Sequence, residues 1–500
     1  MKGGWAKESM MKKKECRYSH LACLSDTYAD VENIMKRIEG SRGVILYFHG
    51  GLSSQKYMKK DLAPKLMESI FSAENLNGLY PVFINYDAGF LDKDNWCCLL
   101  RNQDGLKKYL KKAKKYFKKY FKSSHKKNTL YNEKNIARKI LDDALEKQTK
   151  SMRKKRSLEA YLDILENPKL QKDIGEILIR ESTLEAVRKN LQKIADAEHQ
   201  DKGIANTVKV VKALARSMAR IAIGNNHQIV PTLEEEFFRA FSASKLSIDY
   251  LAKMHWHTVK EHSKQCNAKK SVENYLISRL LEKKGRDKDF TINTVSHSAG
   301  AIPTAHLIKQ MKKKKQKLDT VIMIVPAINQ EDFSKLVMAN EEGFRKLKLY
   351  VLDLEAEEKD TVGKIYPASL LYFVSGTAEE KGYGDKMLLI AQHLDPRRKP
   401  YANDGYLKRV QEYPKKVWTY VAKNPILTYC PSQLNVPSPE KELYSHSTTK
   451  KPWITQTLAR DILFHLTGEK AEIDVTIKKK AKKQRIDKKD DDCAEVKCLK

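Results

Sequence analysis

Residues 290–315 constrain the fold more than any other stretch, because a strand-like run passes into a helical run through a turn of small residues. The segment Phe290–Val295 has the apolar, β-rich composition of a buried strand, and Ala301–Lys315 has the pattern of a helix. Between them lies Ser296-His297-Ser298-Ala299-Gly300. A serine at the apex of a strand-to-helix turn is held clear of the backbone, where a neighbouring base can activate it. The sequence therefore makes Ser298 a candidate nucleophile.

A second strand-like run, Val44–Phe48, ends in His49-Gly50-Gly51-Leu52. Glycines let backbone N–H groups approach a ligand without a Cβ in the way. Acyl transfer needs such donors, aimed at the oxygen on which negative charge develops. Gly50 and Gly51 are therefore candidates for the backbone that carries such donors. The alternatives are a plain glycine turn and, at Ser298, an ordinary helix N-cap.

Taken together, these two motifs resemble the α/β-hydrolase superfamily, over residues of about 40–100 and 235–470. The family pattern at the nucleophile is G-x-S-x-G; here Ser296 replaces the first glycine and Gly300 keeps the last. Further strand-like runs alternate with helical patterns: Tyr80–Tyr86, Asp319–Val325 and Lys346–Leu354. The expected fold is α/β, a mostly parallel sheet with helices on both faces, plus a helical insertion that caps the site. Ligands of such sheets bind beyond the carboxyl ends of the strands.

The resemblance implies an oxyanion hole built from Gly50, Gly51 and Leu52 on one side and the N–H of Ala299 on the other. It also implies an acid after a later strand, in the chain order serine, acid, histidine. The run Lys346–Leu354 leads into a segment rich in carboxylates. Asp353, at the strand end, is the favoured residue. The alternatives left open are Glu355, Glu357 and Asp360.

The same resemblance implies a catalytic base near the C-terminus. His446 lies in a loop just before the last helical pattern, where the family places its base. His465 falls inside a helical apolar pattern and is expected to pack, while His393 lies where a helix ends. His297, beside the serine, is expected to point away from it.

The strand signals vanish between the second strand and the helices that precede Ser298. We expect residues 1–90 and 234–477 to form the two parts of the α/β core, 91–233 a lysine-rich helical cap, and 478–500 a charged, disordered tail. Within the cap, Lys107–Lys127 has aromatic residues at helical spacing and lysines opposite. Such a helix either lies on an anionic bilayer or packs its stripe on the protein body.

The net charge and the cysteine content limit which partners and which cellular compartment are expected. The chain of 500 residues carries a formal net charge of +32, which favours an anionic membrane, nucleic acid or an acidic protein as partner, unless the lysines only decorate solvated faces. Nucleic acid has only this charge in its favour, since no helix-turn-helix, zinc-finger or RRM signature is found. The eight cysteines show no metal-binding spacing, and we expect neither a metal nor a cofactor. No apolar leader or membrane-spanning run is seen, which predicts a soluble cytoplasmic protein.

Two functions are compatible with these features. The first is a serine hydrolase that cleaves a carboxylic ester, a thioester or a lipid acyl bond, with a small molecule or lipid as substrate. The second is a non-enzymatic binding protein on the same fold, whose basic insertion docks an anionic membrane, nucleic acid or an acidic partner. Intact serine, histidine and acid candidates favour the first, because a scaffold has no need of them.

Overall fold

The computed structural model describes fourteen parts of the chain, and every structural statement below concerns these residues alone. They are residues 18–51, 57–71, 75–86, 88, 129–148, 158–181, 200–223, 229–240, 248–360, 366–379, 394, 412–430, 432–434 and 456–469. The lysine-rich segment Lys107–Lys127 and the charged tail 478–500 lie outside them.

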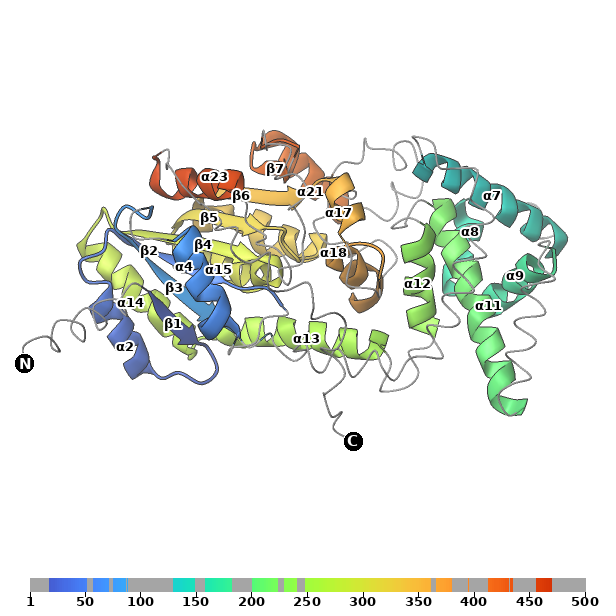
Figure 1. Cartoon of the computed structure of the whole chain (residues 1–500), viewed down its shortest axis with the longest axis horizontal. Helices are drawn as coiled ribbons and strands as arrows, with labels where there is room; N and C mark the ends of the chain where they lie inside the picture. The colour runs from blue at the N-terminus through green and yellow to red at the C-terminus, as the bar shows by residue number, and fades with distance from the viewer. Residues whose placement is uncertain are drawn as a thin grey trace, which may run out of the picture.

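A seven-stranded sheet, parallel throughout, forms the centre of the molecule (Figure 1). Its order is β1-β3-β2-β4-β5-β6-β7. The inner strand β2 pairs with β3 along one edge and with β4 along the other. The strands are β1 (Ser19–Ala22), β2 (Gly43–Phe48), β3 (Leu79–Asn85), β4 (Thr291–His297), β5 (Leu318–Ile324), β6 (Phe344–Leu352) and β7 (Leu427–Cys430). The predicted α/β class with a parallel sheet is thereby confirmed.

Helices cover both faces of this sheet, which is why β2 and β3 are buried along their whole length. Successive side chains of a strand point to opposite faces. Ile45 and Tyr47 accordingly pack in a core with residues of α4 (Ala63–Ser69) and α23 (Gln456–Thr467). Val44, Leu46 and Phe48 pack in a second core with residues of α2 (Tyr28–Arg37), α14 (Val272–Arg286) and α15 (Ala301–Lys313). Figure 1 shows α23 on one side of the sheet and α2, α14 and α13 (Ile248–Cys266) on the other.

The elements that connect or follow the strands have the following bounds. The α-helices are α2 (Tyr28–Arg37), α4 (Ala63–Ser69), α13 (Ile248–Cys266), α14 (Val272–Arg286), α15 (Ala301–Lys313), α16 (Gln330–Asp332), α17 (Leu354–Lys359), α18 (Leu370–Phe373), α21 (Glu412–Lys423) and α23 (Gln456–Thr467). Shorter π or 3₁₀ turns are η1 (Met58–Leu62), η4 (Ser298–Gly300), η5 (Phe333–Val337), η6 (Met338–Gly343) and η7 (Val374–Ala378).

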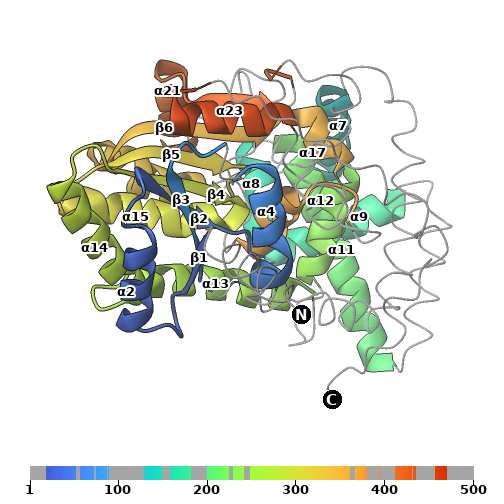
Figure 2. The ribbon, with the colours of Figure 1, turned by 60° about the vertical axis from the view of Figure 1, so that its left-hand side comes forward.

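A group of helices lies beside the sheet and its covering layers, at one end of the molecule (Figures 1 and 2). These are α7 (Thr129–Gln148), α8 (Leu158–Glu166), α9 (Pro168–Glu181), α11 (Gln200–Ile223) and α12 (Ile229–Ala240). The long helix α11 packs against the other four. Among the described residues of 129–240 no strand occurs, in agreement with the helical pattern of the sequence. The boundaries assigned to a cap, 91–233, remain a prediction.

Buried charges join this helical group to the segment that follows β6. Arg220 on α11 forms ion pairs with Glu235 and Glu236 on α12, at 2.7 and 2.9 Å, and all three side chains are almost fully buried. The hydroxyl of Tyr366 donates to Glu235 at 2.5 Å. Arg239 on α12 in turn donates to the carbonyl of Gly376. Because both segments contribute partners, the network connects α12 to the segment 366–379, which contains α18 and η7.

Across the described ranges, no helix combines the length and the apolar character needed to cross a bilayer.

Candidate functional site

The strand order reverses between β2 and β4, and this reversal defines where a ligand is expected. From β2 the chain passes to its neighbour β3 on one side, and from β4 it passes to β5 on the other. The intervening helices α4 and α15 belong to the cores on opposite faces of the sheet. The segments that leave the two strands therefore diverge, and parallel sheets bind ligands at such a switch point, beyond the carboxyl ends of the strands.

Ser298 lies at this point, in a backbone conformation that non-glycine residues rarely adopt. It follows β4 directly and has a φ of +52°. A single 3₁₀ turn, Ser298–Gly300, then leads into α15. The strand, turn and helix expected from the sequence are all present. Strain of this kind persists only where the surroundings impose it, and it gathers at functional sites.

A second strained residue follows the neighbouring strand. Val325 comes directly after β5 and has a φ of +41°, an unusual value for a β-branched residue. Its N–H donates to the carbonyl of Tyr350 at 2.7 Å. Two residues later, the N–H of Ala327 donates to the carbonyl of Ser298 at 2.9 Å. The turn after β5 thus holds the Ser298 turn in place, and no local pattern in the sequence predicts this role.

The glycine loop, residues 49–51, lies directly on the Ser298 turn. A Cβ added to Gly50 would lie 2.9 Å from Nδ1 of His297 and 3.3 Å from Cβ of Ser298. A Cβ on Gly51 would lie 3.0 Å from Cβ of Ala299. The structure therefore brings together Gly50, Gly51, Ser298 and Ala299, the residues that the two motifs singled out. Leu52 lies outside the described residues.

Two histidines hold the carbonyl groups of the glycine loop. Nδ1 of His49 donates to the carbonyl of Gly50 at 2.8 Å, and Nε2 of His255, on α13, donates to the carbonyl of Gly51 at 2.8 Å. In a trans peptide the N–H points opposite to the carbonyl. Fixing the Gly50 carbonyl therefore also fixes the direction of the Gly51 N–H. Burial lowers the pKa of His255 against the opposing effect of this backbone hydrogen bond, so the ring is neutral at neutral pH.

The ring of His49 is itself held by residues at the end of β3. Tyr86 stacks on it, with ring centroids 4.6 Å apart, and the Tyr86 hydroxyl donates to the His49 carbonyl at 2.6 Å. Nε2 of His49 lies 3.2 Å from the side-chain amide oxygen of Asn85. Sequence reasoning missed His255, Tyr86 and Asn85, because they come from segments distant from both motifs and carry no local pattern.

The four acid candidates occupy different environments. Asp353 directly follows β6; its N–H donates to the carbonyl of Cys430 at the end of β7, at 2.7 Å, and its carboxylate accepts the N–H of Ala356 at 2.9 Å, which caps α17. Glu355 is exposed and pairs with Lys359. Asp360 is buried at the end of α17. Glu357 is fully buried, and burial raises its pKa to about 8 in spite of the opposing effect of the nearby Ser369 hydroxyl.

The base candidates are described only in part. His446 and His393 lie outside the described residues. His465 lies on α23, where Nε2 is 3.7 Å from the carboxylate of Asp461 on the same helix. His297 is buried at the end of β4, with Nδ1 beside Gly50. The structure therefore joins the serine to its expected oxyanion donors, while its contact with a base remains a prediction.

Comparisons of the chain with models of protein families, with curated proteins and with solved structures each found no match.

Proposed function

We propose that this chain is a serine hydrolase that cleaves a carboxylic ester, a thioester or a lipid acyl bond, on an α/β-hydrolase fold. One observation carries the proposal. Ser298 combines a φ of +52° with a place at the carboxyl end of a central strand, and the Gly50–Gly51 backbone packs against its turn. A serine in this setting is available for attack beside N–H groups of a kind that stabilises an oxyanion.

The proposed reaction has two stages. The Ser298 Oγ forms a bond to the acyl carbonyl carbon while its proton passes to His446, and the carbonyl oxygen takes the displaced electron pair. The N–H groups of Gly51 and Ala299 hold that oxygen. Collapse of the intermediate expels the leaving group, which takes the proton from His446. Water then attacks the acyl-enzyme by the same steps and releases the acid.

Asp353 is the acid that the environments favour for orienting His446. The triad acid must remain an anion to stabilise the imidazolium. Glu357, with a pKa of about 8, is mostly protonated at neutral pH. The side chain of Glu355 is 76% exposed. Asp353 follows β6 at the same edge of the sheet as Ser298, and its N–H contacts the end of β7, from which the chain continues toward His446.

The experiment that tests this proposal is labelling with a fluorophosphonate probe. The native chain is expected to be labelled at Ser298, and Ser298→Ala is expected to abolish both the label and the turnover of a small soluble ester. Ser296→Ala is the matched control, because the Ser296 hydroxyl is buried within the sheet and donates to the carbonyl of Ile322 at 3.3 Å. Labelling that survives Ser298→Ala would refute the assignment. A folded native chain with neither label nor turnover would instead favour a binding protein.

We expect His255 to act as a positioning residue for the glycine loop, because it holds the carbonyl of Gly51, whose peptide also carries the N–H of the expected donor Leu52. The variant His255→Phe keeps a buried ring but loses the hydrogen bond to the Gly51 carbonyl. Loss of an entire oxyanion donor costs about 10²–10³ in kcat, so misorientation of one should lower kcat by about tenfold or more, with KM nearly unchanged. Steady-state kinetics on a series of soluble acyl esters measure this split.

The control for this variant is His257→Phe, because His257 is exposed on the same helix, two residues further on. His255→Gln, which restores a side-chain N–H donor, should recover part of the loss. Equal effects of His255→Phe and His257→Phe would show that the hydrogen bond to Gly51 has no part in turnover.

A further inference from the structure

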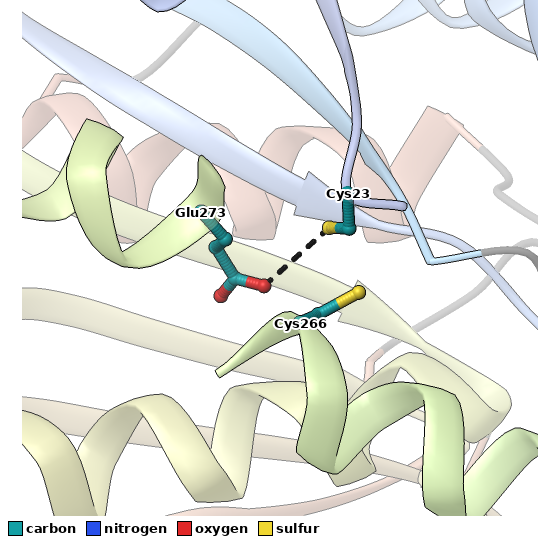
Figure 3. Close-up of side chains that lie close together, drawn as sticks. All are labelled: Cys23, Cys266 and Glu273. Carbon is teal, nitrogen blue, oxygen red and sulfur yellow. Dashed lines mark hydrogen bonds between the residues drawn. The ribbon is translucent and has the colours of Figure 1, made fainter. Parts of the chain in front are cut away.

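Three sulfur and oxygen donors meet in the core at the carboxyl edge of the sheet, apart from the Ser298 turn. They are Cys23, which follows β1, Cys266, which ends α13, and Glu273, in the first turn of α14. Figure 3 shows the Cys23 thiol and the Glu273 carboxylate facing one another, with the Cys266 thiol beside them. One donor atom from each of the three lies within 4.8 Å of the others, and Sγ of Cys23 is 3.6 Å from Oε2 of Glu273.

These distances are close to those of a tetrahedral zinc site. With zinc–sulfur bonds of about 2.3 Å and zinc–oxygen bonds of about 2.0–2.2 Å, a tetrahedral site separates sulfur from oxygen by about 3.5–3.7 Å and two sulfurs by about 3.8 Å. The contact between Cys23 and Glu273 already falls in this range. Only small side-chain movements are needed to bring Cys266 to the same spacing.

The burial of the cluster supplies a second reason for a ligand. Cys266 is fully buried, and Cys23 and Glu273 are 5% and 1% exposed. Among the described residues, Oε1 of Glu273 has no hydrogen-bond partner. A buried polar atom left unsatisfied costs about 1–3 kcal/mol. A cation bound by both carboxylate oxygens would satisfy this atom and, with the two thiolates, would have four ligand atoms in a distorted tetrahedral arrangement.

We propose that Cys23, Cys266 and Glu273 bind one zinc ion. The paired thiols select a soft or borderline metal over Mg²⁺ or Ca²⁺, which take oxygen ligands. Binding needs no oxidant or reductant, because the ligands lose protons to solvent and the metal keeps its charge. The spacing of cysteines along the chain did not reveal the site, since Cys23 and Glu273 are 250 residues apart.

The position of the site gives the metal a structural consequence for the glycine loop. The N–H of Cys23 donates to the carbonyl of Asn85 at 2.9 Å, and Asn85 and the adjoining Tyr86 both contact His49. Cys266 ends the same helix that carries His255. A metal bound to Cys23 and Cys266 would therefore tie the end of β1 to the end of α13, beneath the residues that hold the carbonyls of Gly50 and Gly51.

The test is zinc retention by the full chain. Purified under reducing conditions, loaded with Zn²⁺ and freed of excess, the native chain is expected to keep about one ion that Cys23→Ser and Cys266→Ser lose. Cys430→Ser is the matched control, because Cys430 is a buried thiol at the end of β7, outside the cluster. Glu273→Gln keeps the size of the side chain and removes the carboxylate, so it tests the site even if a serine variant fails to fold. This variant should weaken zinc binding about tenfold or more.

Cobalt loading of the native chain gives an independent readout. Co²⁺ in the site should show thiolate-to-metal charge-transfer absorption and the intense visible bands of four-coordinate cobalt, both lost on addition of Zn²⁺. The proposal is overturned if the native chain keeps no zinc, or if Cys23→Ser, Cys266→Ser and Glu273→Gln all keep it as firmly as Cys430→Ser.

Discussion

Replacing His446 with alanine is expected to lower kcat by about 10⁴-fold or more while the chain remains folded, because the triad members act as a unit and loss of the base removes most of its contribution. The prediction rests on chain order. The acid candidate Asp353 follows β6, and its N–H donates a hydrogen bond to the carbonyl of Cys430 at the end of β7. His446 lies between β7 and α23 in the chain. Ester turnover and the rate of fluorophosphonate labelling should fall together, since both depend on deprotonation of Ser298.

Two other histidines serve as controls for this variant. His393→Ala should have a milder effect, because His393 precedes β7 in the chain, ahead of the position expected for the base. His465→Ala should leave turnover nearly unchanged, because His465 lies on α23 within 3.7 Å of Asp461 on the same helix. A larger loss in His393→Ala than in His446→Ala would show that the base assignment is wrong. Far-ultraviolet circular dichroism separates loss of chemistry from loss of fold.

The central strands could be predicted closely because burial on both faces leaves a continuous apolar run in the sequence. The expected runs Val44–Phe48 and Tyr80–Tyr86 correspond to β2 and β3 within one residue at each end. The predicted strand Lys346–Leu354 differs more, since β6 spans Phe344–Leu352. Its end is set by Asp353, whose carboxylate caps α17 and so begins a helix where the apolar pattern still continued.

The edge strands could not be predicted in the same way. β1 and β7 each have only four residues, and neither has the long apolar run of a strand buried at the centre. Their pairing with β3 and β6 is decided by tertiary packing rather than by local sequence. Since Cys23 follows β1 directly, the same missing signal hid the metal-binding cluster.

The residues of the candidate site also differ in whether a local sequence pattern reveals them. Ser298 and the glycine loop were predictable because a strand-to-helix turn and a glycine pair are local patterns. The contact of His255 with Gly51 joins residues 204 positions apart, and the turn at Val325 acts through a backbone hydrogen bond that any residue could make. Sequence alone therefore points to the proposed reacting groups, whereas the groups that would orient them become visible only in the folded chain.

The buried ion pairs of Arg220 carry the largest stability effect that we expect. Arg220→Met should lower the free energy of unfolding by about 3–5 kcal/mol, because it leaves the buried carboxylates of Glu235 and Glu236 without this guanidinium. Urea denaturation of the full chain measures the change. Lys172→Met is the control: Lys172 pairs with Glu176 at 3.8 Å on the exposed face of α9, and loss of a surface pair costs about 1 kcal/mol at most.

Acid titration of the same network has a definite sign. Burial acts to raise the pKa of Glu236, but the charges of Arg216, Arg239 and Arg220 outweigh it and lower that pKa from 4.5 to about 2. A carboxyl whose folded pKa is depressed contributes stability that is present above pH 4.5 and is lost as the pH falls toward 2. The unfolding free energy of the native chain should therefore decrease across this window, and Arg220→Met should flatten the decrease.

A double variant separates the lost ion pair from lost packing. In Arg220→Met with Glu235→Gln, the amide oxygen still accepts from the Tyr366 hydroxyl, which lies 2.5 Å from the Glu235 carboxylate, but one buried charge is gone. Because the cost of the single variant is mainly that of an uncompensated buried charge, the double variant should recover a large share of the lost stability. If it is no more stable than Arg220→Met, then the side-chain volume of Arg220, rather than its charge, holds α11 and α12 together.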